Sequence, residues 1–139
     1  MAELDDRRGD VPPELIGVLP TVPWQPDLLW ALDLPVEPVS VEELAWLFDL
    51  PLWQLDGERY RLTPREVAEQ PMRYADRYQR VMDTDLNRPI HLVEHRTRLV
   101  VLDGFHRLLK AHFLRRQWID AMILAPADLR SICKPDAPA

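Results

Sequence analysis

The sequence contains a single cysteine, Cys133, so it can form neither an intramolecular disulfide nor a metal site built from several cysteines. Its four histidines show no spacing typical of a zinc site. No apolar run reaches the roughly 18 to 20 residues that a membrane-spanning helix needs. The acidic, proline-rich start does not resemble a secretory signal. We therefore expect a cytoplasmic protein that does not enter a membrane.

Positive charge is also scarce, because 17 Lys and Arg residues face 23 Asp and Glu residues and leave a net charge of −6. This acidity argues against broad nucleic-acid binding, which requires a basic surface to displace counterions. The bases are concentrated, however, since residues 88–118 hold seven of them and only two acids, Glu94 and Asp103. An anionic small molecule fits this local excess better than a nucleic acid does, although a solvated helix face would also explain Arg115 and Arg116.

The first 33 residues are rich in proline and tryptophan, a composition that disfavours long helices and central strands. We predict an extended N-terminal arm over residues 1–33, with a short helical turn near 27–32. Trp24 and Trp30 are expected to fix it to the body, to a protein partner or to a second copy of the chain in a homodimer. Stacking of a cofactor on one of these tryptophans is the alternative. Residues 133–139 are predicted to form a disordered tail.

Residues 34–132 alternate between strand-like and helix-like patterns, which predicts one compact α/β (α+β) domain with a small mixed sheet and packed helices. Capping signals mark several helix starts, and Asp56-Gly57 marks a hairpin. The predicted strands are 34–39, 52–55, 59–62, 89–94, 98–102 and 118–125, and the predicted helices are 41–48, 64–70, 72–82, 105–116 and 125–130.

The clearest candidate site lies where the strand over residues 99–102 ends. Asp103-Gly104 breaks the strand pattern, and from Phe105 the apolar residues follow helical spacing. Free backbone N–H groups at the start of a helix, together with the helix dipole, favour an anion. Gly104 has no Cβ to obstruct the close approach of a ligand. This turn therefore predicts a site for the phosphate groups of a nucleotide.

The run Asp103-Gly104-Phe105-His106-Arg107, placed between a buried strand and a helix, resembles the ParB/sulfiredoxin-like superfamily. A last strand from Trp118 adds to the resemblance, which covers about 34–132 and is strongest over 89–129. It implies a ParB/sulfiredoxin-like domain that binds a nucleotide over the Gly104 turn. ATP, ADP or CTP with Mg²⁺ is the implied ligand.

Departures from each branch of the superfamily narrow the implied activity. Sulfiredoxins carry a nucleophilic cysteine where this chain has Phe105, so we do not expect sulfiredoxin activity. The 139 residues hold no counterpart of the DNA-binding and dimerisation domains of ParB, so we do not expect a DNA clamp. The form Asp-Gly-x-His-Arg is most similar to the branch that phosphorylates free serine. It implies a small-molecule phosphotransferase that uses ATP or ADP and a hydroxyl-bearing substrate. A non-catalytic nucleotide sensor or protein-interaction module is the alternative, and a nucleic-acid-binding ParB-like protein is the weaker one.

Each polar residue of the motif has a candidate role. Arg107 can bind phosphate oxygens through its guanidinium and stabilise charge that develops during transfer. His106 can donate a hydrogen bond to phosphate or take part in proton transfer. Asp103 can hold Mg²⁺ brought by the phosphates, accept a substrate proton, or cap the helix. We predict Asp103 and His106 as catalytic residues and, as the phosphate-binding set, Gly104, Phe105, His106, Arg107 and Lys110.

Other residues near the motif have ordinary structural explanations. Phe105 is expected to pack inward, and His112, on the apolar stripe of its helix, to be a core histidine. His91 and His95 could reach the site from their hairpin, but strand histidines of this kind are ordinarily surface residues. The serine-kinase branch also implies an acidic base nearer the N-terminus, and the candidates by position alone are Glu37, Glu42 and Glu43.

Overall fold

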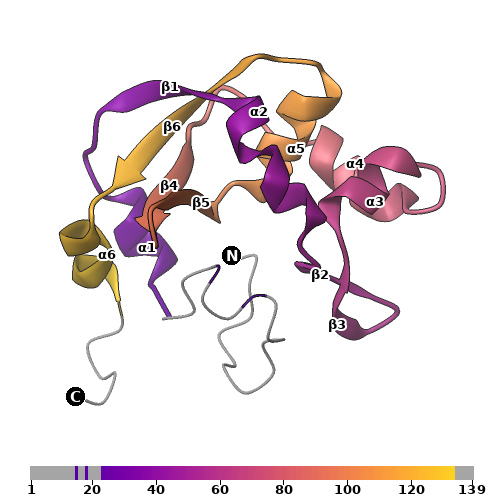
Figure 1. Cartoon of the computed structure of the whole chain (residues 1–139), viewed down its shortest axis with the longest axis horizontal. Helices are drawn as coiled ribbons and strands as arrows, with labels where there is room; N and C mark the ends of the chain where they lie inside the picture. The colour runs from indigo at the N-terminus through magenta and orange to yellow at the C-terminus, as the bar shows by residue number, and fades with distance from the viewer. Residues whose placement is uncertain (1–14, 16–17, 19–22, 134–139) are drawn as a thin grey trace.

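The computed structural model describes residues 15, 18 and 23–133, and within them helices and strands are mixed along the chain (Figure 1). The strands are β1 (Val36–Ser40), β2 (Trp53–Leu55), β3 (Glu58–Leu62), β4 (Ile90–His95), β5 (Arg98–Asp103) and β6 (Trp118–Leu124). The helices are α1 (Pro26–Trp30), α2 (Val41–Leu44), the 3-10 helix η2 (Ala45–Asp49), α3 (Pro64–Glu69), α4 (Ala75–Met82), α5 (Phe105–Phe113) and α6 (Pro126–Ile132).

A four-stranded mixed sheet in the order β1-β6-β4-β5 forms the centre of the fold. Its β4 and β6 strands run parallel and the two outer pairs run antiparallel. All four residues from Ile90 to Val93 of β4 are buried, so both faces of this central strand are covered. Figure 1 shows α2 and α5 on one side of the sheet and α1 and α6 on the other. The predicted α+β class is confirmed.

Short-range sequence signals determine where several elements begin. Thr63 forms a complete capping box with Glu66 at the start of α3, and the Ser40 hydroxyl accepts a hydrogen bond from the Glu43 N–H at the start of α2. The β2–β3 hairpin turns at Asp56 and Gly57, which both have positive φ. These predictions are confirmed. Three helix predictions differ from the structure. The segment predicted as one helix over 41–48 divides into α2 and η2. The helix predicted to begin at residue 72 begins at Ala75, and the helix from Phe105 ends at Phe113 instead of residue 116.

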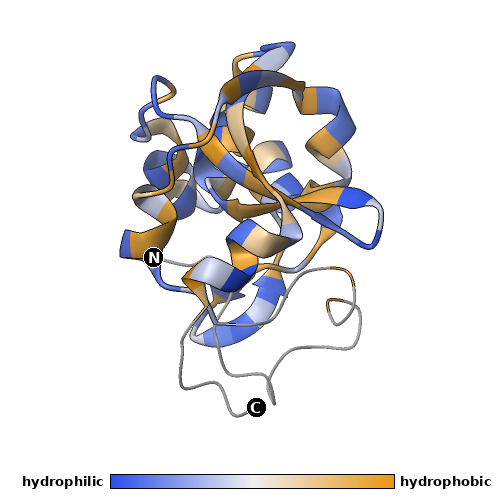
Figure 2. Cartoon of the chain, turned by 90° about the vertical axis from the view of Figure 1, so that its left-hand side faces the viewer, coloured by the Kyte–Doolittle hydropathy of each residue, from blue (hydrophilic) through white to orange (hydrophobic). Residues whose placement is uncertain are grey.

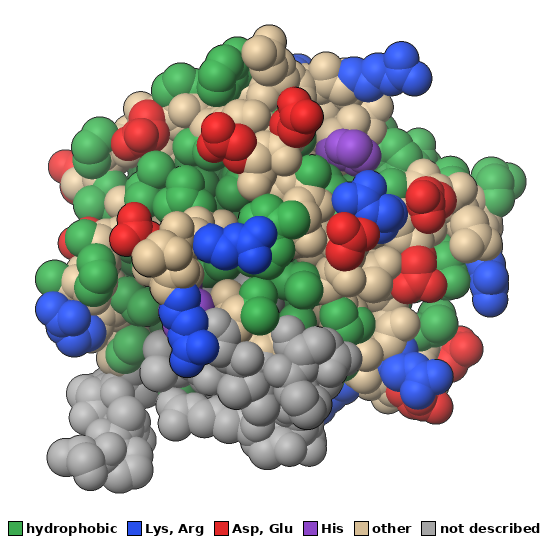
Figure 3. Space-filling view, in the orientation of Figure 1, with side chains coloured by type: hydrophobic (Ala, Val, Ile, Leu, Met, Phe, Trp, Pro, Cys, Tyr) green, Lys and Arg blue, Asp and Glu red, His purple; other side chains and the backbone are tan. Residues whose placement is uncertain are grey.

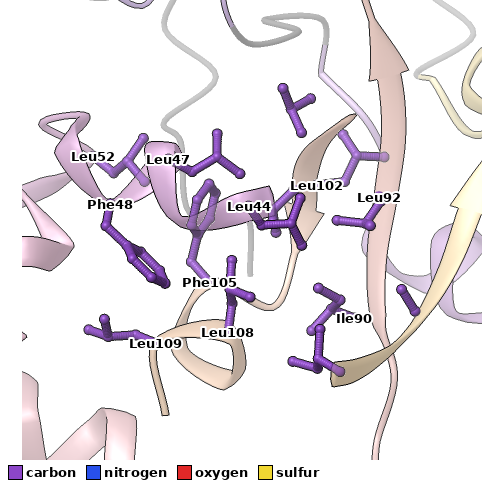
Figure 4. Packing of buried hydrophobic residues seen from close by; sticks show 14 of the residues in the cluster. Leu44, Leu47, Phe48, Leu52, Ile90, Leu92, Leu102, Phe105, Leu108 and Leu109 are labelled. Carbon is purple, nitrogen blue, oxygen red and sulfur yellow. The ribbon is translucent and has the colours of Figure 1, made fainter. Parts of the chain in front are cut away.

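The main core lies between the sheet and the helices α2, η2 and α5 (Figure 4). Figure 2 shows hydrophobic and hydrophilic residues interspersed along the helices and strands, while several of the outlying loops are hydrophilic. Phe105 is 1% exposed, which confirms that it packs inward. Its neighbours in this core come from α5 itself and from α2, η2, β4 and β5, and include Leu44, Phe48, Ile90, Leu102, Leu108 and Leu109. The start of α5 is therefore anchored in the close-packed core.

The described part of the N-terminal arm packs against the body. Trp24 forms an isolated antiparallel bridge with Cys133, and the Gln25 N–H donates to the Ile132 carbonyl at 2.9 Å. Leu29 is fully buried. The predicted tail beyond Cys133 and most of residues 1–22 lie outside the described residues. Among the residues that the structure does describe, no helix combines the length and the apolar character that a membrane span requires.

Gly104 occupies a position that only glycine fits. Its φ is +114°, and a Cβ added there would lie 2.5 Å from Cγ2 and 2.8 Å from Cβ of Ile90. This packing contact explains the glycine without a ligand, and the expectation that Gly104 lets a ligand approach stays a prediction. The space that a side chain would need is filled by the β4 residue Ile90, so the glycine allows strand and helix to pack closely.

We expect Gly104→Ala to lower the free energy of unfolding by roughly 2–5 kcal/mol, since it adds overpacking to backbone strain. Gly57→Ala is the matched control, because Gly57 also has positive φ (+82°) but has nothing within 4 Å of its would-be Cβ. The control should lose only about 1–2 kcal/mol from strain. Urea unfolding of both variants checks this, and equal losses would show that the Ile90 contact is unimportant.

Candidate functional site

A cleft of about 320 Å³ opens beside the start of β4, and segments far apart in the sequence meet in it. Its floor comes from three neighbouring strands, because the sheet register places His91 of β4 beside Met122 of β6 and opposite Asp103 of β5. The other walls come from α1, from the loop before β4 and from the first turn of α5. The lining residues are Trp30, Arg88, Pro89, His91, Asp103, Arg107 and Met122.

Asp103 takes part in most of the side-chain contacts described for the cleft. Its Oδ2 accepts hydrogen bonds from Trp30 Nε1 at 3.2 Å and from Arg107 Nη2 at 3.4 Å. The same oxygen lies 3.8 Å from His91 Nδ1. The Asp103 side chain does not cap α5, which starts at an N-cap Gly104 with no side-chain capping bond. Its carboxylate is therefore part of the cleft and leaves the N–H groups of the first helical turn without a side-chain cap.

Arg107 is held in place from two sides. It lies in the first turn of α5, four residues after Asp103 at the end of β5, and its Nη2 lies 3.4 Å from Asp103 Oδ2. Besides its bond to Asp103, Nη2 donates to the carbonyl of Pro89 at 3.3 Å. The side chain is only 16% exposed. Nη1 donates no hydrogen bond to the described residues, so this guanidinium is fixed and retains donors for a ligand.

His91 is 6% exposed and lies in the cleft floor, so of the two alternatives it reaches the site, and the expectation of an ordinary surface histidine is wrong. Its Nδ1 is buried and has no hydrogen-bond partner among the described residues. Burial lowers its pKa below the ordinary histidine value, and the positive charges of Arg107 and Arg88 act in the same direction, while Asp103 opposes them. The lowered pKa favours the neutral form of His91 at pH 7, so the side chain adds little positive charge to the cleft.

His106 points away from the cleft, although it precedes Arg107 in the sequence. Consecutive helical residues lie about 100° apart around the axis. The His106 ring stacks on Trp53 at 5.1 Å between ring centroids and 14° between planes. Its Nε2 lies 3.3 Å from Arg77 Nη1. The structure thus does not bring the two predicted catalytic residues, Asp103 and His106, into one cavity.

The remaining predicted site residues also lie outside the cleft lining. Lys110 Nζ donates to the Thr84 carbonyl at 2.6 Å and so fastens α5 to the loop that follows α4. His112 is half-buried and packs on Phe48 with ring centroids 5.1 Å apart, and burial lowers its pKa. The three glutamates predicted as candidates for the catalytic base, Glu37, Glu42 and Glu43, do not line the cleft. Asp103 is the single carboxylate among the lining residues.

The part of the chain that the structure describes contains no group of three or more His, Cys, Asp or Glu side chains able to hold a metal ion. The single carboxylate of Asp103 could instead bind a metal ion that is brought by a ligand. Mg²⁺ is commonly held by one or two carboxylates together with water and the phosphate oxygens of a substrate. The donor set of the cleft therefore fits Mg²⁺ that arrives with a phosphorylated ligand.

Comparison with protein-family models, with curated proteins and with solved structures gives no match to this chain. The resemblance to the ParB/sulfiredoxin-like superfamily rests on the run from Asp103 to Arg107 and on its strand–turn–helix setting. It stays a prediction.

The lowered pKa of His91 predicts a loss of stability in weak acid. Below the ordinary histidine pKa of about 6.5 the unfolded chain binds more protons than the folded protein, so the free energy of unfolding falls as the pH drops. His112, whose pKa is also lowered, adds to the same trend. Urea unfolding between pH 7.5 and 5.5 should show the decline, and His91→Gln should make it smaller. An NMR titration that places the midpoint of His91 above 6.5 would contradict the assignment.

Proposed function

We propose that the cleft binds the phosphate groups of a nucleotide and that Arg107 is their main ligand. The supporting observation is the state of its guanidinium, which is largely buried, fixed by Asp103 and Pro89, and free to donate from Nη1. A preorganised guanidinium loses little entropy on binding and matches the geometry of phosphate oxygens. Arg107 lies in the first turn of α5, whose start has no side-chain cap, and the positive end of a helix dipole favours an anion nearby.

The charges of the cleft suit a ligand with several negative charges and a bound cation. Arg88 and Arg107 contribute two positive charges, Asp103 contributes one negative charge, and His91 adds little positive charge. Arg88 is exposed and makes no ion pair with the described residues, so it is available to a ligand at the rim. Mg²⁺ held by Asp103 and by the phosphates would offset the remaining charge.

Phosphoryl transfer to a small hydroxyl-bearing molecule is the catalytic form of this proposal. It needs a group that accepts the hydroxyl proton, and Asp103, the one carboxylate of the cleft lining, would take this role. His106 stacks on Trp53 outside the cleft, so the proposed mechanism gives it no proton-transfer step. Without transfer, the same cleft would serve a cytoplasmic nucleotide sensor.

The surface gives less support to nucleic-acid binding. On the face seen in Figure 3, basic and acidic side chains are interspersed over the described residues. A nucleic acid requires a continuous basic surface, since its affinity comes largely from neutralised phosphates. A small phosphorylated ligand requires only the few positive groups that meet in the cleft.

We expect wild-type protein to bind ATP, ADP or CTP in calorimetric titrations with Mg²⁺, and Arg107→Ala to weaken binding by at least about tenfold, because hydrogen bonds to charged groups contribute roughly 1.5–3 kcal/mol each. Arg107→Lys should lose part of the affinity, since a lysine keeps the charge but not the bidentate geometry. Arg116→Ala is the matched control, because Arg116 is exposed and lies outside the cleft lining. Absence of binding at millimolar nucleotide, or equal affinity of Arg107→Ala and wild type, would refute the proposal.

Asp103→Asn separates binding from transfer. It keeps the size of the side chain but removes the charge that accepts a proton and holds Mg²⁺. Nucleotide binding without Mg²⁺ should be retained or improved, whereas the gain in affinity from Mg²⁺ should shrink and phosphorylation of hydroxyl acceptors, free serine first, should fall by about 100-fold or more. If wild-type protein binds nucleotide but phosphorylates no acceptor, the sensor function is supported and the transferase function is not.

A further inference from the structure

Trp30 is a large aromatic side chain held at the cleft with half of its surface in solvent. It is the last residue of α1 and is 52% exposed. Its Nε1 donates to Asp103 Oδ2, which fixes one edge of the indole. Leu29, the preceding residue, is fully buried and anchors the helix. The ring is therefore immobilised without being covered, an arrangement that folding alone does not favour, because an exposed indole gains little hydrophobic stabilisation.

Apolar surface continues from the cleft along the sheet. The register aligns Val36 of β1 with Met122 of β6, Met122 with His91 of β4, and His91 with Asp103 of β5. Met122 lines the cleft, and Val36 is 50% exposed. Across this row the character changes from apolar at the β1 edge to charged at the β5 edge. A ligand that fills the cleft would have an anionic part and a flat or apolar part.

We infer that Trp30 forms a nucleobase subsite, on which the base of the ligand stacks while Arg107 and Arg88 hold its phosphates. This inference rests on the proposed function and deepens it, since it selects nucleotides over phosphosugars and inorganic polyphosphates. Every nucleobase has a π-face, so stacking on an indole gives affinity for a nucleotide with little preference for one base. The residue comes from the N-terminal arm, which lies outside the run of residues from Asp103 to Arg107.

A pair of ligands that differ only in the nucleoside tests this subsite. ADP and methyl diphosphate carry the same phosphate chain, on adenosine in one and on a methyl group in the other, and each is titrated with Mg²⁺ into the full chain by calorimetry. Wild-type protein should bind ADP about tenfold or more tighter than methyl diphosphate, the range seen for stacking of one base. CDP should show a similar preference, because the indole does not read the edge of the base.

Three variants identify the source of that preference. Trp30→Leu should reduce the affinity for ADP to nearly that for methyl diphosphate while leaving the latter unchanged. Trp30→Phe should retain most of the preference, because it keeps an aromatic face although it loses the N–H that bonds Asp103. Trp118→Leu is the matched control, since Trp118 is 54% exposed and lies outside the cleft lining. Circular dichroism and thermal unfolding show whether each variant is folded.

The outcomes separate the two proposals. Equal binding of ADP and methyl diphosphate by wild-type protein would overturn the base subsite and leave the phosphate site standing. An equal loss for both ligands in Trp30→Leu would also overturn it, because the tryptophan would then act only through Asp103. If neither ligand binds, the proposed function fails, and the subsite fails with it.

Discussion

The Asp103 carboxylate is the group around which the other side chains of the cleft are arranged. A single oxygen of this side chain accepts hydrogen bonds from Trp30 of α1 and from Arg107 of α5, and lies close to His91 of β4. A largely buried carboxylate requires such partners, because an unpaired charge in a region of low dielectric is strongly unfavourable. The need to satisfy one negative charge therefore fixes the position of the aromatic and cationic groups that face the cleft. A ligand phosphate would meet an Arg107 that is already oriented.

A β-bulge places Asp103 opposite His91, and it explains why the cleft could not be read from the sequence. Regular pairing from the turn outward gives His95 with Arg98 and Leu92 with Val101, which would continue with His91 opposite Leu102. The register shifts between His91 and Leu92, and His91 pairs with Asp103 instead. A shift of one residue moves side chains to the other face of a strand. Nothing in the local sequence marks this bulge, so the burial of His91 beside Asp103 was not predicted.

Features determined by neighbouring residues were predicted well. The capping box at Thr63, the hairpin turn at Asp56 and the strand–turn–helix unit at Gly104 each depend on a few adjacent side chains and on backbone geometry. Features that depend on tertiary packing were not. The contribution of Trp30 to the cleft and the stacking of His106 on Trp53 require knowledge of where α1 and the β2–β3 hairpin lie. Adjacent residues on a helix can serve different surfaces, and the sequence alone does not say which.

The run from Asp103 to Arg107 has structural as well as functional explanations in this chain. The glycine is required by Ile90, and Phe105 belongs to the core. His106 is held by Trp53 and Arg77, and Asp103 is held by Arg107 and Trp30. Arg107 differs, because its contacts to Asp103 and to the Pro89 carbonyl leave donors unused in a cavity of ligand size. The strongest functional evidence in the motif is therefore carried by this one guanidinium. Asp103 lines the same cleft, whereas Gly104, Phe105 and His106 have packing contacts that account for them.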